Sequence, residues 1–305
     1  MVFPILGGLG MTHVALVTWR LGFEQTERRR VKSVFSKIVS PEVVNELLSA
    51  EKLSLGGARR LVTVLFADVR GFTELTDNAQ EQAVEHVRRH NLGGEEAEAY
   101  LNEVAHETLS TVNLYLAIVA DMVKKHDGTL DKYIGDCVMA FWGAPIPNSR
   151  HALACVRAAI DAQRSIFKLN QRRTEESARR EIENRARESA GLRPLQLLPV
   201  LSLGTGINTG LVTVGLMGSE AHIFNYTVFG REVNLASRLE HESGRGRIVI
   251  SESTFEQLRR DDPSVAARCI PLDSVTVKGI RTAVKIYEVP WKDLEKPPGG
   301  KSQEP

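Results

Sequence analysis

The chain has 305 residues, of which 42% are hydrophobic and 25% charged, with 39 basic residues against 38 acidic ones. This near-neutral balance argues against a nucleic-acid-binding protein, and we expect no nucleic acid partner. Three cysteines without close pairing or zinc-ligand spacing argue against a disulfide-built secreted fold.

The first predicted element is an apolar stretch at residues 2–19, VFPILGGLGMTHVALVTW, close to the shortest length that spans a bilayer as a helix. Basic residues follow from Arg20 onward and would hold its C-terminal side in the cytoplasm. A proline, three glycines and a histidine weaken the pattern, so a buried helix of a soluble protein is the alternative. We expect residues 1–20 to be a transmembrane helix, or the C-terminal stump of a longer membrane region, that places the chain at the cell membrane.

Residues 21–58 are predicted to form a helical linker. Apolar residues recur at helical spacing in RRVKSVFSKIV, and Ser40-Pro41-Glu42 is a helix-start signal. The glycine-containing stretch EKLSLGGARR then indicates a boundary, so the main domain should begin near Arg59. At the other end, residues 292–305 are rich in proline, glycine and charge, and are predicted to be disordered.

Strand-like and helical patterns alternate through residues 59–291. Helices are expected from about 95 to 125 and from about 150 to as far as 189, and two strands flank a Gly135-Asp136 turn. LPVLSLGTGINTG and LVTVGLMG are read as another strand pair, with their glycines marking close turns. The later elements are expected in HIFNYTVFG, VNLASRLEHES, RIVIS, SESTFEQLRR, DSVTVKG and VKIYEV. This alternation predicts one mixed domain of helices and strands.

The stretch VLFADVRGFT places Asp68 at the end of an apolar strand. The glycine after it allows a sharp turn, so the backbone N–H groups of Phe72 and Thr73 at the next helix start would face a polyphosphate. An aspartate at a strand end often only caps a helix, and that structural role is the alternative.

A second acidic residue, Asp136, lies at the tip of the strand–turn–strand DKYIGDCVMAFWG. If the two strands pair in one sheet, Asp68 and Asp136 become neighbours despite their separation in sequence. Two adjacent carboxylates repel each other unless a divalent cation lies between them, and hard oxygen ligands suit magnesium or manganese. A purely structural hairpin turn is the alternative.

Asn234 and Arg238 are four residues apart near the start of a predicted helix, and therefore share one face. An amide and a guanidinium in this arrangement can hold a sugar oxygen and a phosphate. Spacing alone equally fits an ordinary polar helix face.

Four stretches in order, FADVRGFT, TLDKYIGDCVMAFWGAP, GINTGLVTVG and NYTVFGREVNLASRLE, resemble the catalytic domain of class III nucleotidyl cyclases over about residues 59–291. The preceding RRVKSVFSKIVSPEVVNELL resembles the signalling helix of bacterial membrane-anchored members. The resemblance implies an α+β fold, with a ferredoxin-like βαββαβ core and additional strands. It also implies a homodimer, formed through the catalytic domain and the linker, whose active sites are shared between the two copies.

The resemblance also assigns roles. Asp68 and Asp136 match the family's metal-binding aspartates, which implies two Mg²⁺ or Mn²⁺ ions per active site. Asn234 and Arg238 match the transition-state pair supplied by the other protomer. The implied reaction converts ATP to 3′,5′-cyclic AMP and pyrophosphate by attack of the ribose 3′-OH on the α-phosphate.

Lys132 and Thr227 fall at the family's two purine-selecting positions. Lysine donates hydrogen bonds and accepts none, so Lys132 suits the unprotonated N1 of adenine and opposes the N1–H of guanine. We therefore predict an adenylate cyclase. A guanylate cyclase, or an idle nucleotide-binding regulatory domain, is the alternative.

The sequence indicates less clearly which basic side chains would bind the terminal phosphates of the nucleotide. Many family members have an arginine where this chain has Gly204, and Arg247 is a candidate replacement. Lys278 lies in a loop whose family pattern often reads Lys-Gly-Lys, but Ile280 holds the second lysine position. Arg247 and Lys278 are thus expected substrate-binding residues, with solvated surface charge as the alternative.

Overall fold

The computed structural model describes residues 57–190, 192, 194–218, 224–276 and 283–292, and all of them belong to one unit that spans residues 55–305. The predicted transmembrane helix, the linker up to residue 56 and the tail from residue 293 lie outside the described residues. None of the helices that are described has the length and apolar character needed to cross a bilayer.

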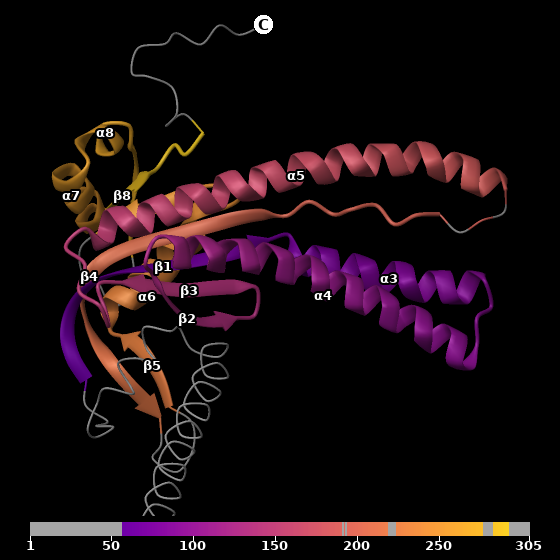
Figure 1. Cartoon of the computed structure of the whole chain (residues 1–305), viewed down its shortest axis with the longest axis horizontal. Helices are drawn as coiled ribbons and strands as arrows, with labels where there is room; N and C mark the ends of the chain where they lie inside the picture. The colour runs from indigo at the N-terminus through magenta and orange to yellow at the C-terminus, as the bar shows by residue number, and fades with distance from the viewer. Residues whose placement is uncertain (1–56, 191, 193, 219–223, 277–282, 293–305) are drawn as a thin grey trace, which may run out of the picture. The chain divides into compact units, whose positions relative to one another are not determined.

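The described strands form one sheet of eight strands (Figure 1). Their bounds are β1 Gly57–Arg70, β2 Thr129–Ile134, β3 Cys137–Trp142, β4 Ser202–Gly218, β5 Phe224–Phe229, β6 Ile248–Ser251, β7 Ile270–Val275 and β8 Val284–Glu288. The strand order is β2-β3-β1-β4-β6-β8-β7, and β5 pairs with β4 outside this path.

The order β4-β1-β3-β2 is that of a ferredoxin-like fold. β1 lies between β3 and β4 and is antiparallel to both, and β3 is antiparallel to β2. Helices connect β1 to β2 and β3 to β4, which completes the βαββαβ pattern. The added strands begin with β6, which is parallel to β4. The predicted α+β class with a ferredoxin-like core and additional strands is therefore confirmed.

Helices cover both faces of the sheet. The described helices are α3 Phe72–Arg89, α4 Gly94–Lys125, α5 His151–Ser189, α6 Arg231–Ser243, α7 Glu252–Asp261 and α8 Pro263–Ala266. The larger core joins α4, α5 and α7 to the side of β1 that carries Leu65, Ala67 and Val69. A second core joins α6 and β5 to the side that carries Val64 and Phe66. Because successive residues of a strand point to opposite faces, Asp68 lies on the α6 side.

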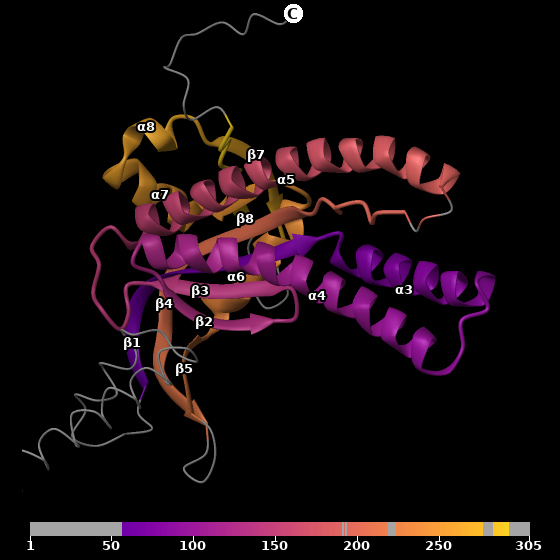
Figure 2. The same ribbon diagram turned by 45° about the vertical axis from the view of Figure 1, so that its right-hand side comes forward.

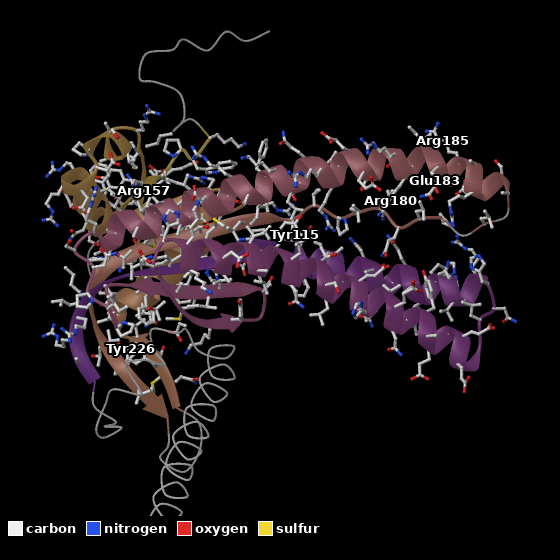
Figure 3. All side chains as sticks on the ribbon, viewed as in Figure 1. Tyr115, Arg157, Arg180, Glu183, Arg185 and Tyr226 are labelled. Atoms are coloured by element: carbon white, nitrogen blue, oxygen red, sulfur yellow. The ribbon has the colours of Figure 1, made fainter. Side chains whose placement is uncertain are left out.

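Two helical regions continue past the sheet: the α3–α4 pair and the C-terminal half of α5 (Figures 1 and 2). Tyr115 joins α4 to α5, because its buried hydroxyl donates to Asn170 Oδ1 at 2.5 Å and accepts from the Leu201 N–H at 3.2 Å (Figure 3). Farther along α5, Arg180 donates to the carbonyl of Gln196 at 2.7 Å. The polar residues 170–189 thus belong to the helix expected to run as far as residue 189.

The prediction of a strand pair in residues 198–218 is wrong, because β4 is one continuous strand and its hairpin partner is β5. The 14-residue β1 pairs with β4 along its whole length, from Arg70 opposite Ser202 to Gly57 opposite Gly215, which keeps β4 extended through its glycines. The glycines of GTGINTG therefore lie within the strand and do not mark turns. A Cβ at Gly206 would collide with the backbone of α6 at Ala236 and Glu240, so this glycine lets α6 approach the sheet closely.

We predict that Gly206→Ala destabilises the fold by about 3 kcal/mol, because the added methyl group meets helix backbone that cannot move without displacing α6. Urea unfolding of the two proteins measures the difference. Gly93→Ala is the matched control, since a Cβ there meets nothing within 4 Å and Gly93 has a negative φ, and it should cost less than about 1 kcal/mol. Equal losses in both variants would contradict the close-approach account.

Candidate active site

The structure brings Asp68 and Asp136 together. Asp68 lies opposite Cys137 in the β1–β3 ladder, and the next backbone amide, that of Val69, donates to the carbonyl of Asp136 at 3.2 Å. Asp136 occupies the tight turn between β2 and β3, after Gly135 in the left-handed conformation with φ 64°. Pairing of β1 with β3 thus has the effect expected from sequence, which is to place two distant carboxylates at one end of the sheet.

The two carboxylates repel each other electrostatically. Burial, and then the negative charge of Asp136, raise the pKa of Asp68 above its ordinary value, while Arg70 opposes the rise. A divalent cation between the two carboxylates would relieve the repulsion, and carboxylate oxygens are the ligands that magnesium and manganese prefer. The donor set therefore fits the family's metal. No cluster of three or more histidine, cysteine or acidic ligands occurs among the residues described, so phosphate and water oxygens would have to complete the coordination.

Arg70 is a site residue that the sequence reading did not single out. Its Nη1 lies 3.0 Å from Asp68 Oδ2, and its Nη2 forms an ion pair with Glu240 of α6. The Glu240 side chain is only 4% exposed, and burial raises its pKa. Arg70 therefore links Asp68 on β1 to the helix that carries Asn234 and Arg238. The available signal was an arginine two residues after the aspartate, which places both on the same face of the strand.

The helix after β1 begins where the sequence suggested. Gly71 is the N-cap in the left-handed conformation with φ 91°, and α3 starts at Phe72. The first N–H groups of a helix have no partner within the helix, so those of Phe72 and Thr73 are suited to an anion. Phe72 is anchored by packing against the larger core, whereas Thr73 is exposed. The Asp68 end of β1 therefore leads directly into a helix N-terminus.

Asn234 and Arg238 are both exposed on α6, whose buried side includes Val233, Ala236 and Leu239. In the part of the chain that the structure describes, neither side chain forms a hydrogen bond or ion pair. The pair is therefore available to a molecule outside this chain, which is the arrangement expected for residues that complete a site on a second copy.

Lys132 and Thr227 come together through a residue that the sequence reading missed. The Thr227 hydroxyl donates to Asp131 Oδ2 at 2.5 Å, and Lys132 Nζ lies 3.3 Å from Asp131 Oδ1. This contact joins β2 to β5, which pair with different strands of the sheet. The available signal was the carboxylate directly before Lys132 in the stretch LDKYIGD.

The two residues expected to bind the terminal phosphates have different outcomes. Arg247, just before β6, is engaged in an ion pair, with Nε 2.7 Å from Glu288 Oε2, and a phosphate would have to compete with that carboxylate. It lines a cavity of about 410 Å³ with Phe167 and Trp291. Lys278 lies outside the described residues. Both assignments stay predictions.

Cys137 lies opposite Asp68 in the β1–β3 ladder, and its thiol is partly buried. Burial, and then the negative charges of Glu240 and Asp68, raise its pKa to about 12. Without a metal ion beside it, the thiol therefore stays protonated near neutral pH.

Comparisons with known proteins agree with this geometry. A family model described as the adenylate and guanylate cyclase catalytic domain matches residues 58–290. Adenylate cyclase 1 of Rhizobium meliloti (strain 1021) is 28% identical over 282 residues, which cover 91% of this chain and 35% of that protein. This chain spans less than half the length of the first curated relatives that it matches: 10%, 35% and 42%.

Two solved structures extend the comparison to three dimensions. The adenylyl cyclase CyaB from P. aeruginosa has a TM-score of 0.53 and 32% identity, and the alignment covers 77% of this chain and 96% of that one. The guanylyl cyclase Cya2 also has a TM-score of 0.53, with 29% identity over 77% of this chain and 94% of its own. Since the family match covers most of the sequence, this chain belongs to the adenylate and guanylate cyclase catalytic-domain family, the class III nucleotidyl cyclases.

Proposed function

We propose that the protein is an adenylate cyclase that converts ATP to 3′,5′-cyclic AMP and pyrophosphate. The observation that carries this proposal is the meeting of Asp68 and Asp136 at the sheet end where α3 begins. In a chain of this family, that end of the sheet offers carboxylates for divalent cations beside backbone donors for phosphate.

In the proposed mechanism, Asp68 and Asp136 hold two divalent cations, Mg²⁺ or Mn²⁺. When bound, such ions lower the pKa of a ribose hydroxyl and neutralise charge on a triphosphate. Phe72 and Thr73 donate backbone hydrogen bonds to the phosphates, and Asn234 orients the ribose. The ribose 3′-oxygen forms a bond to the α-phosphorus as the bond to the bridging oxygen breaks, and the hydroxyl proton passes to solvent. Arg238 meets the charge that develops on the α-phosphate oxygens.

The purine is selected by Lys132, which donates to N1 of adenine, together with Thr227. A guanylate cyclase is the second candidate, because the guanylyl cyclase Cya2 is nearly as similar to this chain as the adenylyl cyclase CyaB is. We favour ATP because the N1–H of guanine would face a second donor at Lys132.

We further propose that each active site is shared across a homodimer. Asn234 and Arg238 are exposed and available, whereas Asp68 lies on the buried side of α6, next to Glu240. A closed two-fold dimer would let the pair on one copy complete the metal-binding half of the other, and would create two equivalent sites.

The full chain, incubated with Mn²⁺ and either ATP or GTP, should produce cyclic AMP in preference to cyclic GMP, as measured by chromatography. Asp68→Asn should lower turnover at least about 100-fold, because it removes a charged metal ligand. Asp273→Asn is the matched control, an exposed strand aspartate on β7 at the opposite sheet edge from β2, and should leave turnover unchanged. Preferred use of GTP would support the second candidate, and no product from either nucleotide would favour an idle regulatory domain.

Co-expression of Asp68→Asn with Asn234→Ala should restore about a quarter of wild-type turnover, although each variant alone is inactive. Half of a random mixture is heterodimer, and each heterodimer has one intact site of two. Co-expression of Asp68→Asn with Asp136→Asn is the control, because both changes damage the same half-site and no dimer regains a complete one. Recovery in the control, or none in the test mixture, argues against shared sites.

We also propose that residues 2–19 anchor the chain in the cell membrane, with the catalytic domain in the cytoplasm, as their apolar character and the basic residues after them suggest. The full chain should then sediment with membranes and be released by detergent but not by high salt. A chain starting at Gly57 should remain in the supernatant. A full chain found in the salt extract would contradict anchoring by a spanning helix.

A further inference from the structure

A β-bulge lies in the strand that carries Lys132. β2 pairs with β3 at Leu130 opposite Ala140 and again at Lys132 opposite Met139, so Asp131 is the extra residue. In a regular strand the side chains of Asp131 and Lys132 would point to opposite faces. The bulge re-aims them, and their charged atoms approach to 3.3 Å.

The Asp131 carboxylate is enclosed. Its side chain is 1% exposed, whereas that of Lys132 is 36% exposed. Burial raises the pKa of Asp131. Three contacts lower that pKa: the hydrogen bond from Thr227, the charge of Lys132 and a hydrogen bond with the Val228 backbone. Its Oδ1 has no hydrogen-bond partner among the described residues, and only the ammonium of Lys132 compensates it. A buried charge of this kind is costly and is retained where it orders its neighbours.

The contact from Thr227 fixes the direction of a hydroxyl proton. A threonine hydroxyl has one proton to donate and lone pairs that accept. Because the carboxylate takes that proton at 2.5 Å, only the lone pairs of Thr227 Oγ1 remain for a third group. The bond is partly buried and Thr227 is 1% exposed, so few water molecules compete for the proton.

The chemistry of purines makes this direction matter. The 6-amino group of adenine donates hydrogen bonds, whereas O6 of guanine accepts them. A hydroxyl that can only accept forms a hydrogen bond with the amino group of adenine. It repels O6 of guanine, because the lone pairs of the two oxygens then face each other. Lys132 is the exposed member of the cluster, so its ammonium can turn toward N1 of an entering purine while the buried Thr227–Asp131 bond stays intact.

We propose that Asp131 is a specificity-determining positioning residue, which locks the Thr227 hydroxyl as an acceptor for the adenine 6-amino group and holds Lys132 beside it. This inference rests on the proposed cyclase function and on the purine-selecting roles of Lys132 and Thr227. Asp131 itself does not touch the base and acts through its two neighbours.

The test compares ATP with purine riboside triphosphate, which has the same N1 acceptor but hydrogen in place of the 6-amino group. The ratio of kcat/KM for the two nucleotides isolates the contact to the amino group. We expect the wild-type full chain to prefer ATP by about tenfold, the value of one buried hydrogen bond. In Asp131→Leu and in Thr227→Val, this ratio should fall to within about twofold of one.

Three further variants make the result specific. Asp131→Asn keeps an acceptor oxygen of similar shape and should retain most of the ratio. Asp131→Leu combined with Thr227→Val should lower the ratio no further than either change alone, because both remove one interaction. Asp273→Asn, an exposed aspartate at the far edge of the sheet, should keep the wild-type ratio.

GTP gives an independent readout. Without the carboxylate, the Thr227 hydroxyl is free to rotate and donate to O6, so Asp131→Leu should use GTP several-fold better relative to ATP. Thr227→Val has no hydroxyl and should not gain in this way. A change that merely loosens the fold would lower turnover of all three nucleotides together and leave every ratio unaltered.

The proposal is overturned if Asp131→Leu keeps the wild-type preference for ATP over purine riboside triphosphate, or if Asp131→Asn loses as much as Asp131→Leu. Should Asp131→Leu lack a cooperative unfolding transition, Asp131→Val, a strand-forming residue without an acceptor, takes its place in the same comparison.

Displacement of a fluorescent ATP analogue by the same nucleotides gives the ratios as dissociation constants. If the wild-type chain converts neither ATP nor GTP, the proposed function is refuted. The ratios of dissociation constants then still test the role of Asp131. Cyclic AMP production with unaltered ratios would refute the role of Asp131 alone.

Discussion

The candidate site depends on the antiparallel pairing of β1 with β3. That pairing places Asp68 opposite Cys137, and so brings the carboxylate at the end of one strand against the turn that holds Asp136. Burial and like-charge repulsion together make the ionised form of Asp68 unfavourable. In the proposed function, a divalent cation between the two carboxylates would relieve this repulsion.

A second constraint is the close approach of α6 to the sheet. Gly206 leaves room for the backbone of the helix, and the ion pair between Arg70 and Glu240 joins the helix to the end of β1. Because Arg70 also contacts Asp68, a shift of α6 would displace a partner of that carboxylate. The same helix carries Arg238 on its exposed face. The end of β1 and the helix that carries Arg238 are therefore connected through Arg70 and Glu240.

The proposed purine selection depends on a β-bulge. The bulge at Asp131 breaks the alternation of β2, and the Asp131 carboxylate contacts both Lys132 and Thr227 of β5. A buried carboxylate would be a liability in an ordinary strand. Here it orders a lysine and a threonine that come from separate parts of the sequence, and the cost of its burial is offset by their charge and hydrogen bond.

The sequence by itself determined the class of fold and pointed to the candidate site residues, because strand and helix periodicity, the aspartates and the Asn234–Arg238 spacing are local properties. Tertiary structure decided which side chains meet. The continuous β4, the close fit of Gly206 under α6 and the link from Arg70 to Glu240 depend on partners far away in sequence. The contact of Asp131 with Thr227 depends on the bulge between β2 and β3 and on the register of β5 against β4, which no local pattern encodes.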